Sequence, residues 1–346
     1  MKKVVGILGG MAGLGGTAYL LRKQKRKELR RKYNLLDEIP DKDLFALPGF
    51  ICNPTGFKMY NRILTGGQGE FVQGVSRTQR YIDSFDNQKI ELYIYEPEDS
   101  ENEVLPCLVY FHGGAYFIDY LPGYHRILAN YAKNARCRVV SVRYRTLVEV
   151  PYKSSLKDCY QGLLWTYDNA KQLGIDKERI AIGGDSAGGT YAAAVTHLVR
   201  EWNGPRLCYQ MLIYPATDMS VSSASAKRCV DSPGWNSACS RNTFKYIIPS
   251  LDDETRPYFN LIEQKNFEGL CDAYVEVEEN DCLHDDGEKY AQLLKESGYD
   301  VYYNDMKGTY HGYDQNQNLQ VSKDVMKLRC ELLRKAFGTE QEGGVR

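Results

Sequence analysis

The chain has 346 residues, of which 43% are hydrophobic and 26% are charged, which suits one large α/β domain or two small ones. Its formal net charge of -1 hides an asymmetry, because residues 1–32 carry ten basic groups and one acid, a sum of +9, so the remainder sums to -10. An acidic body of this kind argues against a nucleic-acid partner.

The first segment combines an uncharged stretch, residues 4–21, with a basic block that ends at Lys32. Eighteen uncharged residues approach the ~20 that span a bilayer, although six of them are glycines. Because the positive-inside rule keeps such a block in the cytoplasm, residues 1–32 are a candidate membrane anchor on the inner face of the membrane. A soluble or membrane-surface tail and a secretory signal are the alternatives.

Residues 13–18 also fit the GxGxxG/A pattern of dinucleotide-binding proteins. That pattern requires a second strand ending in an acidic residue about 20 positions later, where this chain has its basic block. We therefore expect no nucleotide site.

The following segment, residues 33–80, contains three prolines and a glycine-rich turn, and is expected to form a lead-in and part of a cap. Strands and helices then alternate over residues 81–337, which favours a mostly parallel sheet flanked by helices. A polar, proline-containing stretch at about 216–270 breaks this rhythm and is expected to be a second part of the cap. Residues 338–346 are expected to be a flexible tail.

The strongest motif is Gly184-Asp185-Ser186-Ala187-Gly188, a GxSxG element between an expected strand at 180–183 and an expected helix at 187–200. In this context the motif predicts a nucleophile elbow, with the serine hydroxyl above the sheet. The N–H of Ala187 opens the helix, where the helix dipole favours negative charge.

A second glycine motif follows the expected strand at 107–111: His112, Gly113 and Gly114, then Ala115. Two glycines let the backbone approach a substrate closely. Their N–H groups, with that of Ala187, predict an oxyanion hole.

Together these two motifs resemble the hormone-sensitive-lipase-like family of α/β-hydrolases, and the resemblance runs from about residue 80 to 337. It implies an eight-stranded, mostly parallel sheet flanked by helices, with a cap built from the N-terminal segment and an insertion. The family's Tyr-Arg segment is matched by Tyr144-Arg145, but the residues that usually follow it are not kept.

The acid and the base are expected after the serine, because α/β-hydrolases follow the chain order serine, acid, histidine. Among the five histidines, His311 alone lies in a glycine-flanked loop after the last expected strand. The stretch 279–285 resembles the family's Glu-x-Asp-Pro-Leu-x-Asp pattern with Cys282 in place of proline, which assigns Asp281 as the acid.

The predicted function is a serine carboxylesterase that hydrolyses short- to medium-chain acyl or acetyl esters through an acyl-Ser186 intermediate. Tyr116 and Phe117 are expected either to contact the small-molecule ester or to pack under the cap. Neither a metal nor an organic cofactor is needed. An amidase or deacetylase with the same triad, or a non-catalytic small-molecule receptor of the same fold, are the alternatives. The oligomeric state is not predicted.

Overall fold

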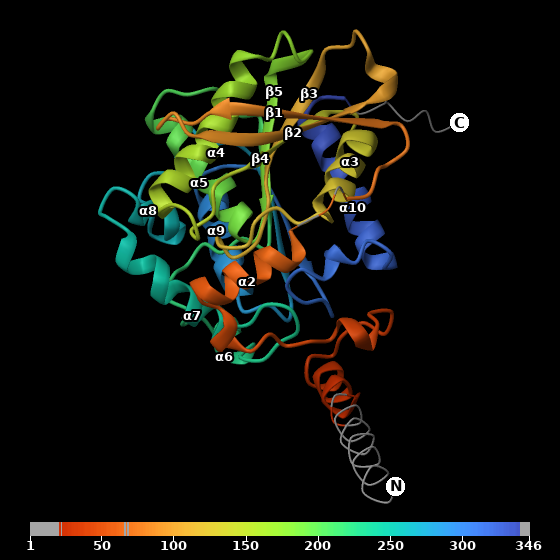
Figure 1. Ribbon diagram of the computed structural model, residues 1–346, viewed down its shortest axis with the longest axis vertical. Coiled ribbons are helices and arrows are strands. Elements are labelled where there is room, and N and C mark those ends of the chain that lie inside the picture. Colours follow the sequence, from red (N-terminus) through yellow and green to blue (C-terminus); the bar gives the residue numbers. More distant parts are fainter. Residues whose placement is uncertain (1–20, 22, 66, 68, 340–346) are drawn as a thin grey trace, which may run out of the picture.

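The computed structural model describes residues 21, 23–65, 67 and 69–339 (Figure 1). At its centre is an eight-stranded sheet with the strand order β1-β2-β4-β3-β5-β6-β7-β8. The strands β4, β3, β5, β6, β7 and β8 are parallel, whereas β2 is antiparallel to both of its neighbours. This architecture confirms the predicted fold class. The strands are β1 (Val75–Asp83), β2 (Lys89–Pro97), β3 (Leu105–Phe111), β4 (Arg138–Arg143), β5 (Ile175–Asp185), β6 (Tyr209–Ile213), β7 (Ala273–Glu278) and β8 (Val301–Met306).

Helices cover both faces of this sheet. In β3, Leu108 and Tyr110 pack into the core beneath α3 and α10, while Val109 and Phe111 pack into the core beneath α4, α5 and α9. This division follows from the two-residue period of a strand, which sends successive side chains to opposite faces. The covering helices are α3 (Tyr124–Ala135), α4 (Tyr152–Asp168), α5 (Ala187–Glu201), α9 (His284–Glu296) and α10 (Gln320–Ala336).

A cap lies over one end of the sheet and is built from two distant parts of the chain. The first part precedes β1 and contains α2 (Pro54–Leu64), and the second follows β6 and contains α6 (Ala224–Arg228), α7 (Ser237–Ile247) and α8 (Arg256–Phe259) (Figure 1). The two parts are joined by a hydrogen bond of 2.9 Å from the Asn236 side-chain amide to the Leu47 carbonyl.

Two elements differ from the sequence prediction. The strand β1 begins at Val75, so the boundary expected at residue 80 lies too late. The sequence of β1 lacks a clear alternation of apolar and polar residues, because β1 is an edge strand and side chains such as Arg80 are exposed to solvent. The helix α3 was not predicted, although eight of its twelve residues are buried.

The candidate anchor at residues 4–21 lies outside the described residues except for Leu21, and so do the glycine pattern at 13–18 and most of the expected tail at 338–346. Within the described part of the chain, no helix is both long enough and apolar enough to cross a bilayer.

One fully buried cation ties the sheet to α10. The Arg329 guanidinium is 1% exposed; it donates to Glu276 on β7 (2.9 Å) and to Asp314 in the loop after β8 (2.8 Å). Because Glu276 has no exposure to solvent, its charge depends on this arginine for compensation.

Replacing Arg329 with methionine is expected to lower the free energy of unfolding by about 3–5 kcal/mol, because Glu276 would be left buried without its counter-charge. Urea denaturation would measure the loss. The control Lys335→Met removes an exposed cation from the same helix and should change stability little. The double variant Glu276→Gln, Arg329→Met should recover most of the loss, and an Arg329→Met chain as stable as the parent would contradict this account.

Candidate active site

Ser186 lies in the sharp turn between β5 and α5. Its backbone has φ 55° and ψ −121°, a conformation that non-glycine residues rarely adopt. The flanking glycines are required by close packing: a Cβ on Gly184 would lie 2.3 Å from the Gly188 carbonyl oxygen, and a Cβ on Gly188 would lie 2.1 Å from that of Phe111. The turn therefore has the geometry of a nucleophile elbow.

The three residues predicted as a triad form a hydrogen-bonded series in which His311 lies between Ser186 and Asp281. The Nε2 atom of His311 is 2.8 Å from the Ser186 hydroxyl oxygen, and its Nδ1 atom is 2.5 Å from Oδ2 of Asp281. Asp281 is fully buried, and its other oxygen accepts the N–H of Leu283 at 3.0 Å. With Nδ1–H donated to the carboxylate, Nε2 is free to accept the serine proton.

The Tyr214 ring packs against the imidazole of His311. The two ring centroids are 4.6 Å apart, and the Tyr214 hydroxyl donates to Asp314 at 2.7 Å. Since Asp314 also pairs with Arg329, the buried cation of α10 is connected through two side chains to the predicted base.

A second buried carboxyl group, Glu278, lies three residues before Asp281. It has no exposure to solvent, and neither of its oxygens has a hydrogen-bond partner among the described residues. Burial, together with the charges of Glu276 and Asp281, raises its pKa well above the ordinary value. Burial therefore favours the neutral form of Glu278, and Asp281 is the carboxyl group that is hydrogen-bonded to His311.

We call residues 112–115, which follow β3, the oxyanion loop. Its hydrogen bonds contradict one part of the predicted set of N–H donors to the oxyanion. The N–H of Gly113 already donates to the Tyr124 hydroxyl oxygen (2.8 Å) and to Oδ1 of Asp185 (3.1 Å), so it is not available to a substrate. The N–H groups of Gly114 and Ala115 make no hydrogen bond with any described residue.

The free N–H groups lie in an unusual stretch of backbone, with φ 131° at Gly114 and φ 54° at Ala115. Across the site, Ala187 is the first residue of α5, where backbone N–H groups lack partners within the helix. The available donors are therefore Gly114, Ala115 and Ala187. The predicted set contained Gly113 in place of Ala115.

Asp185 holds the oxyanion loop to the nucleophile turn. Besides the Gly113 N–H, it accepts the hydroxyls of Tyr110 (2.9 Å) and Tyr124 (2.7 Å). Burial raises the pKa of Asp185 to about 6, so the carboxylate is the predominant form only above that pH. The roles of Asp185 and Tyr124 were not predicted, because nothing in the sequence shows that α3 reaches this loop.

His112 has a structural place in the same loop. Its ring stacks on Tyr144 with centroids 4.4 Å apart, and its Nδ1 lies 2.7 Å from the Gly113 carbonyl oxygen. Burial lowers the pKa of His112 to about 4, so the ring is neutral near pH 7 and does not compete with His311 as a base.

A cavity of about 290 Å³ opens onto Ser186 and His311. Its walls are mainly apolar and come from both parts of the cap and from the oxyanion loop. The apolar side chains that line it are Leu47, Ile51, Phe57, Ile118, Leu121 and Trp235.

Tyr116 and Phe117 are not among the residues that line this cavity. The Tyr116 hydroxyl lies 2.9 Å from that of Thr190, and the Phe117 ring stacks on Phe57 at a centroid distance of 5.0 Å. Both side chains are 2% exposed, so the structure gives them the packing role that was the alternative to substrate contact.

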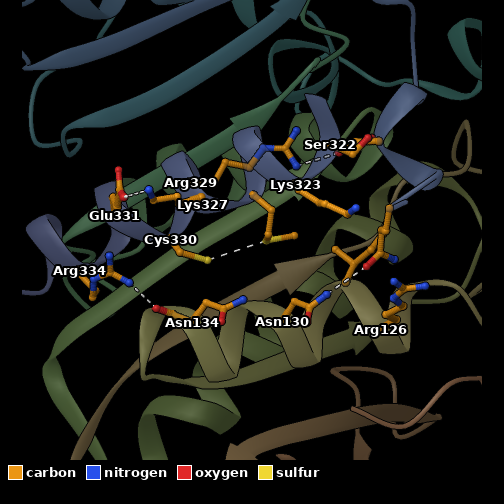
Figure 2. A pocket seen from close by; sticks show the side chains of 14 residues that line it. Arg126, Asn130, Asn134, Ser322, Lys323, Lys327, Arg329, Cys330, Glu331 and Arg334 are labelled. Carbon is orange, nitrogen blue, oxygen red and sulfur yellow. Dashed lines mark hydrogen bonds and ion pairs between the residues drawn. The ribbon is translucent and has the colours of Figure 1, made fainter. Parts of the chain in front are cut away.

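A larger hollow of about 510 Å³ lies between α3 and α10 (Figure 2). Polar and basic side chains such as Arg126, Asn130 and Lys323 line it, but none of the predicted catalytic residues does. The smaller apolar cavity is therefore the candidate active site, because the predicted nucleophile and base lie there.

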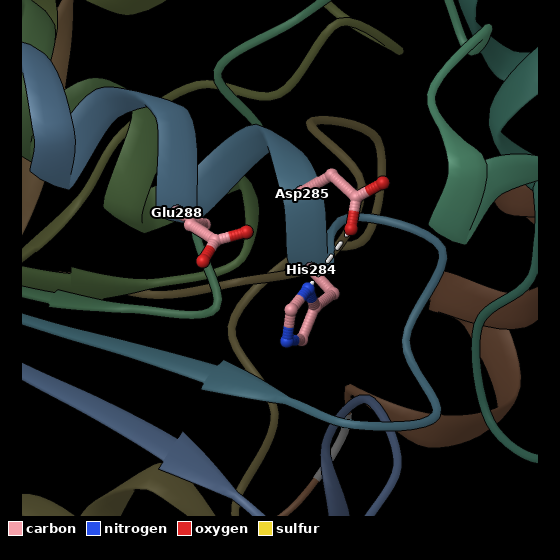
Figure 3. A group of neighbouring side chains, drawn as sticks. All are labelled: His284, Asp285 and Glu288. Carbon is pink, nitrogen blue, oxygen red and sulfur yellow. Dashed lines mark hydrogen bonds and ion pairs between the residues drawn. The ribbon is translucent and has the colours of Figure 1, made fainter.

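The described residues include one group that could hold a metal ion, formed by His284, Asp285 and Glu288 at the start of α9 (Figure 3). Two of its side chains have partners within the protein, because His284 pairs with Asp285 at 3.0 Å and with Asp305 at 3.6 Å. Asp285 also accepts the N–H of Ser225 at 2.8 Å.

The sheet order, the elbow at Ser186 and the residues hydrogen-bonded to it define an α/β-hydrolase fold. A family model described as the alpha/beta hydrolase fold matches residues 108–315, and the chain belongs to this family. The predicted assignment to its hormone-sensitive-lipase-like branch is thereby confirmed.

Several proteins to which the chain is similar in sequence or structure are esterases. The chain is 35% identical over 212 residues to the carboxylesterase NlhH of Mycobacterium tuberculosis, a match that covers 60% of this chain and 66% of that protein. It is 30% identical to an arylesterase of Saccharolobus solfataricus, over 69% of this chain and 78% of that protein. The crystal structure of the esterase rPPE superposes with a TM-score of 0.75 at 26% identity, over 83% of this chain and 91% of that chain.

Replacing Tyr124 with phenylalanine is expected to lower kcat about tenfold with little change in KM, because the Gly113 N–H and Asp185 would lose their shared partner and the oxyanion donors would lose their alignment. Steady-state kinetics on p-nitrophenyl butyrate would measure this. Tyr209→Phe is the matched control, since the Tyr209 side chain is largely buried and its hydroxyl makes no hydrogen bond with any described residue. A selective rise in KM for Tyr124→Phe would indicate a substrate contact instead.

Proposed function

We propose that the protein is a serine carboxylesterase acting on esters with short to medium acyl chains. The observation that carries this proposal is the hydrogen-bonded series from Ser186 through His311 to Asp281. The named esterases with similar sequence and structure support the same class of substrate.

In the proposed mechanism, the Ser186 oxygen attacks the ester carbonyl carbon while His311 Nε2 takes the serine proton. Asp281 fixes the imidazole tautomer and stabilises the imidazolium that forms. The imidazolium then gives its proton to the departing alcohol, which leaves an acyl-Ser186 ester. A water molecule, deprotonated by His311, attacks that ester and releases the carboxylic acid.

The negative charge of each tetrahedral intermediate is stabilised by the N–H groups of Gly114, Ala115 and Ala187. Two of these donors follow β3 and the third opens α5, so the oxyanion is held between two elements of the fold. The positive end of the α5 dipole adds to this stabilisation. Removing one such donor typically costs ~10²–10³ in kcat.

The dimensions and lining of the cavity favour small apolar acyl groups. A volume of about 290 Å³ lies near the lower end of the range for small-molecule sites. Each buried methylene contributes about 0.8 kcal/mol until the cavity is filled. We therefore place the optimum among short acyl chains rather than among the long chains of storage lipids.

Replacing Ser186 with alanine is expected to reduce kcat on p-nitrophenyl esters by about 10⁶-fold, the scale observed when a serine hydrolase loses its nucleophile. Rates would be measured on acetate to laurate esters with the full chain. The control Ser222→Ala, at an exposed site in the cap, should keep the parent activity. Turnover that survives in Ser186→Ala would contradict the mechanism.

The same chain should be tested on p-nitroacetanilide. Serine-dependent hydrolysis of this anilide at a rate comparable to the ester would favour the amidase. Binding of esters without turnover of either substrate would favour the receptor.

A further inference from the structure

Two cap segments, residues 44–69 and 232–251, differ in charge from the rest of the body. They contain the cations Lys58, Arg62, Arg241 and Lys245 and no carboxylate, whereas residues 33–346 as a whole sum to -10. Among the described residues, none of these four cations forms an ion pair. None of the four charges is therefore neutralised by a direct ion pair within the described part of the chain, although acidic residues flank both segments: Asp43, Glu70, Asp231 and Asp252.

The same segments expose large apolar side chains. On α2, Met59 and Ile63 are 65% and 64% exposed, and they lie one turn apart on the same face. Phe50, just before this helix, is 78% exposed. The opposite face of α2 is held by the protein, because Phe57 is buried and stacks on Phe117. The exposed face is therefore firmly positioned and lacks an apolar partner among the described residues.

The two segments contact one another. Gly49 lies directly against α7, where a Cβ on this glycine would be 2.7 Å from the Ala238 carbonyl oxygen. The helix α7 then presents Tyr246, which is half-exposed, beside its two cations. We call the exposed side chains of residues 44–65, 67, 69 and 232–251 the cap surface.

A basic helix lies next to the cap surface. Residues 23–32 are helical and carry seven cations and one acid. Lys25 and Arg26 from this helix line the same hollow as Phe45 of the cap. The helix extends from the same end of the molecule as α2, α6 and α7 (Figure 1). Positive charge and exposed apolar side chains thus occur together at this end.

We propose that the cap surface docks on an anionic lipid bilayer. Apolar side chains of this kind partition into the boundary between headgroups and acyl chains, while lysine and arginine bind the anionic headgroups. A second copy of the chain fits this surface less well, because its own unpaired cations would repel one another.

The cap surface also lies at the mouth of the active-site cavity. Ile51 lines that cavity and is at the same time partly exposed on the cap surface. On the proposed esterase function, docking would therefore bring the cavity mouth to the layer from which an amphipathic ester departs.

The test uses full-length protein carrying Ser186→Ala, so that lipid binding is measured without hydrolysis and its failure is separable from failure of the esterase mechanism. Tryptophan is introduced by Ile63→Trp or, as a matched control, by Val104→Trp, which is 62% exposed just before β3. The vesicles contain phosphatidylcholine with or without phosphatidylserine, and a portion carries brominated acyl chains. The fluorescence at Ile63→Trp is expected to shift to the blue and to be quenched by brominated lipid, whereas that at Val104→Trp should not change.

Charge is tested separately by Lys58→Gln. Since one cation near an anionic membrane is worth about 1 kcal/mol, its loss should weaken binding to phosphatidylserine vesicles about fivefold. Lys289→Gln, an exposed site on α9, should have a much smaller effect.

Absence of quenching at Ile63→Trp would overturn the proposal even if the chain binds vesicles through another segment. A fluorescence shift that depends on protein concentration without vesicles, together with a dimer in sedimentation, would also overturn it and assign the surface to self-association.

Discussion

The active site depends on how closely α5 approaches the ends of β3 and β5. The carbonyl of Phe111, the last residue of β3, leaves no room for a side chain on Gly188, the second residue of α5. This contact places the amino end of α5 against the start of the oxyanion loop. The nucleophile, the helix dipole and two N–H donors from the loop are thus brought together by backbone packing alone, before any catalytic side chain is considered. The positive φ of Ser186 is the local cost of that approach.

The buried charged groups around the site are stabilised by one another and by hydrogen-bond donors. Five carboxyl groups are buried in or beside it, and Arg329 is the one fully buried cation among the described residues. Arg329 compensates two of them, Glu276 and Asp314, while burial raises the pKa of Glu278 and so favours its neutral form. Asp185 is stabilised by hydroxyl and N–H donors. Asp281 is the remaining carboxylate, and the imidazole of His311 is its partner.

The parts of the site that could be predicted were those set by local backbone constraints. A serine between two glycines at a strand-to-helix turn has few structural explanations, and chain order then selected His311. The N–H donors of the oxyanion hole were harder to predict. The N–H of Gly113 is occupied by Tyr124 and Asp185, which are distant from it in sequence. The orientations of the Tyr116 and Phe117 side chains could not be predicted from the sequence either. They follow from positive φ values at residues 115 and 116, which turn both rings into the core.

The fold was easiest to predict where strands are buried on both faces. The central strands β3 and β4 read as apolar runs because helices cover them on both sides. The edge strand β1 carries Arg77, Gln79 and Arg80 in solvent or at its margin, and its pattern resembles a loop. The burial of Arg329 could not be predicted from the sequence, because an arginine in an amphipathic helix is ordinarily solvated. Its burial here depends on the contact with β7.

On the proposed function and docking, the cavity and the cap surface would act on substrate selection through the same hydrophobic effect in different ways. Inside the cavity, each methylene of an acyl chain contributes about 0.8 kcal/mol, close to a fourfold change in binding, until the apolar walls are filled. Beyond that length the added carbons remain outside and contribute nothing to the chemical step. Contact of Phe50, Met59 and Ile63 with an apolar layer would raise the local concentration of every ester held there, whatever its chain length. Chain-length preference therefore belongs to the cavity and access belongs to the cap, so substitutions at Trp235 should change the preferred acyl chain while substitutions at Ile63 should leave it unaltered.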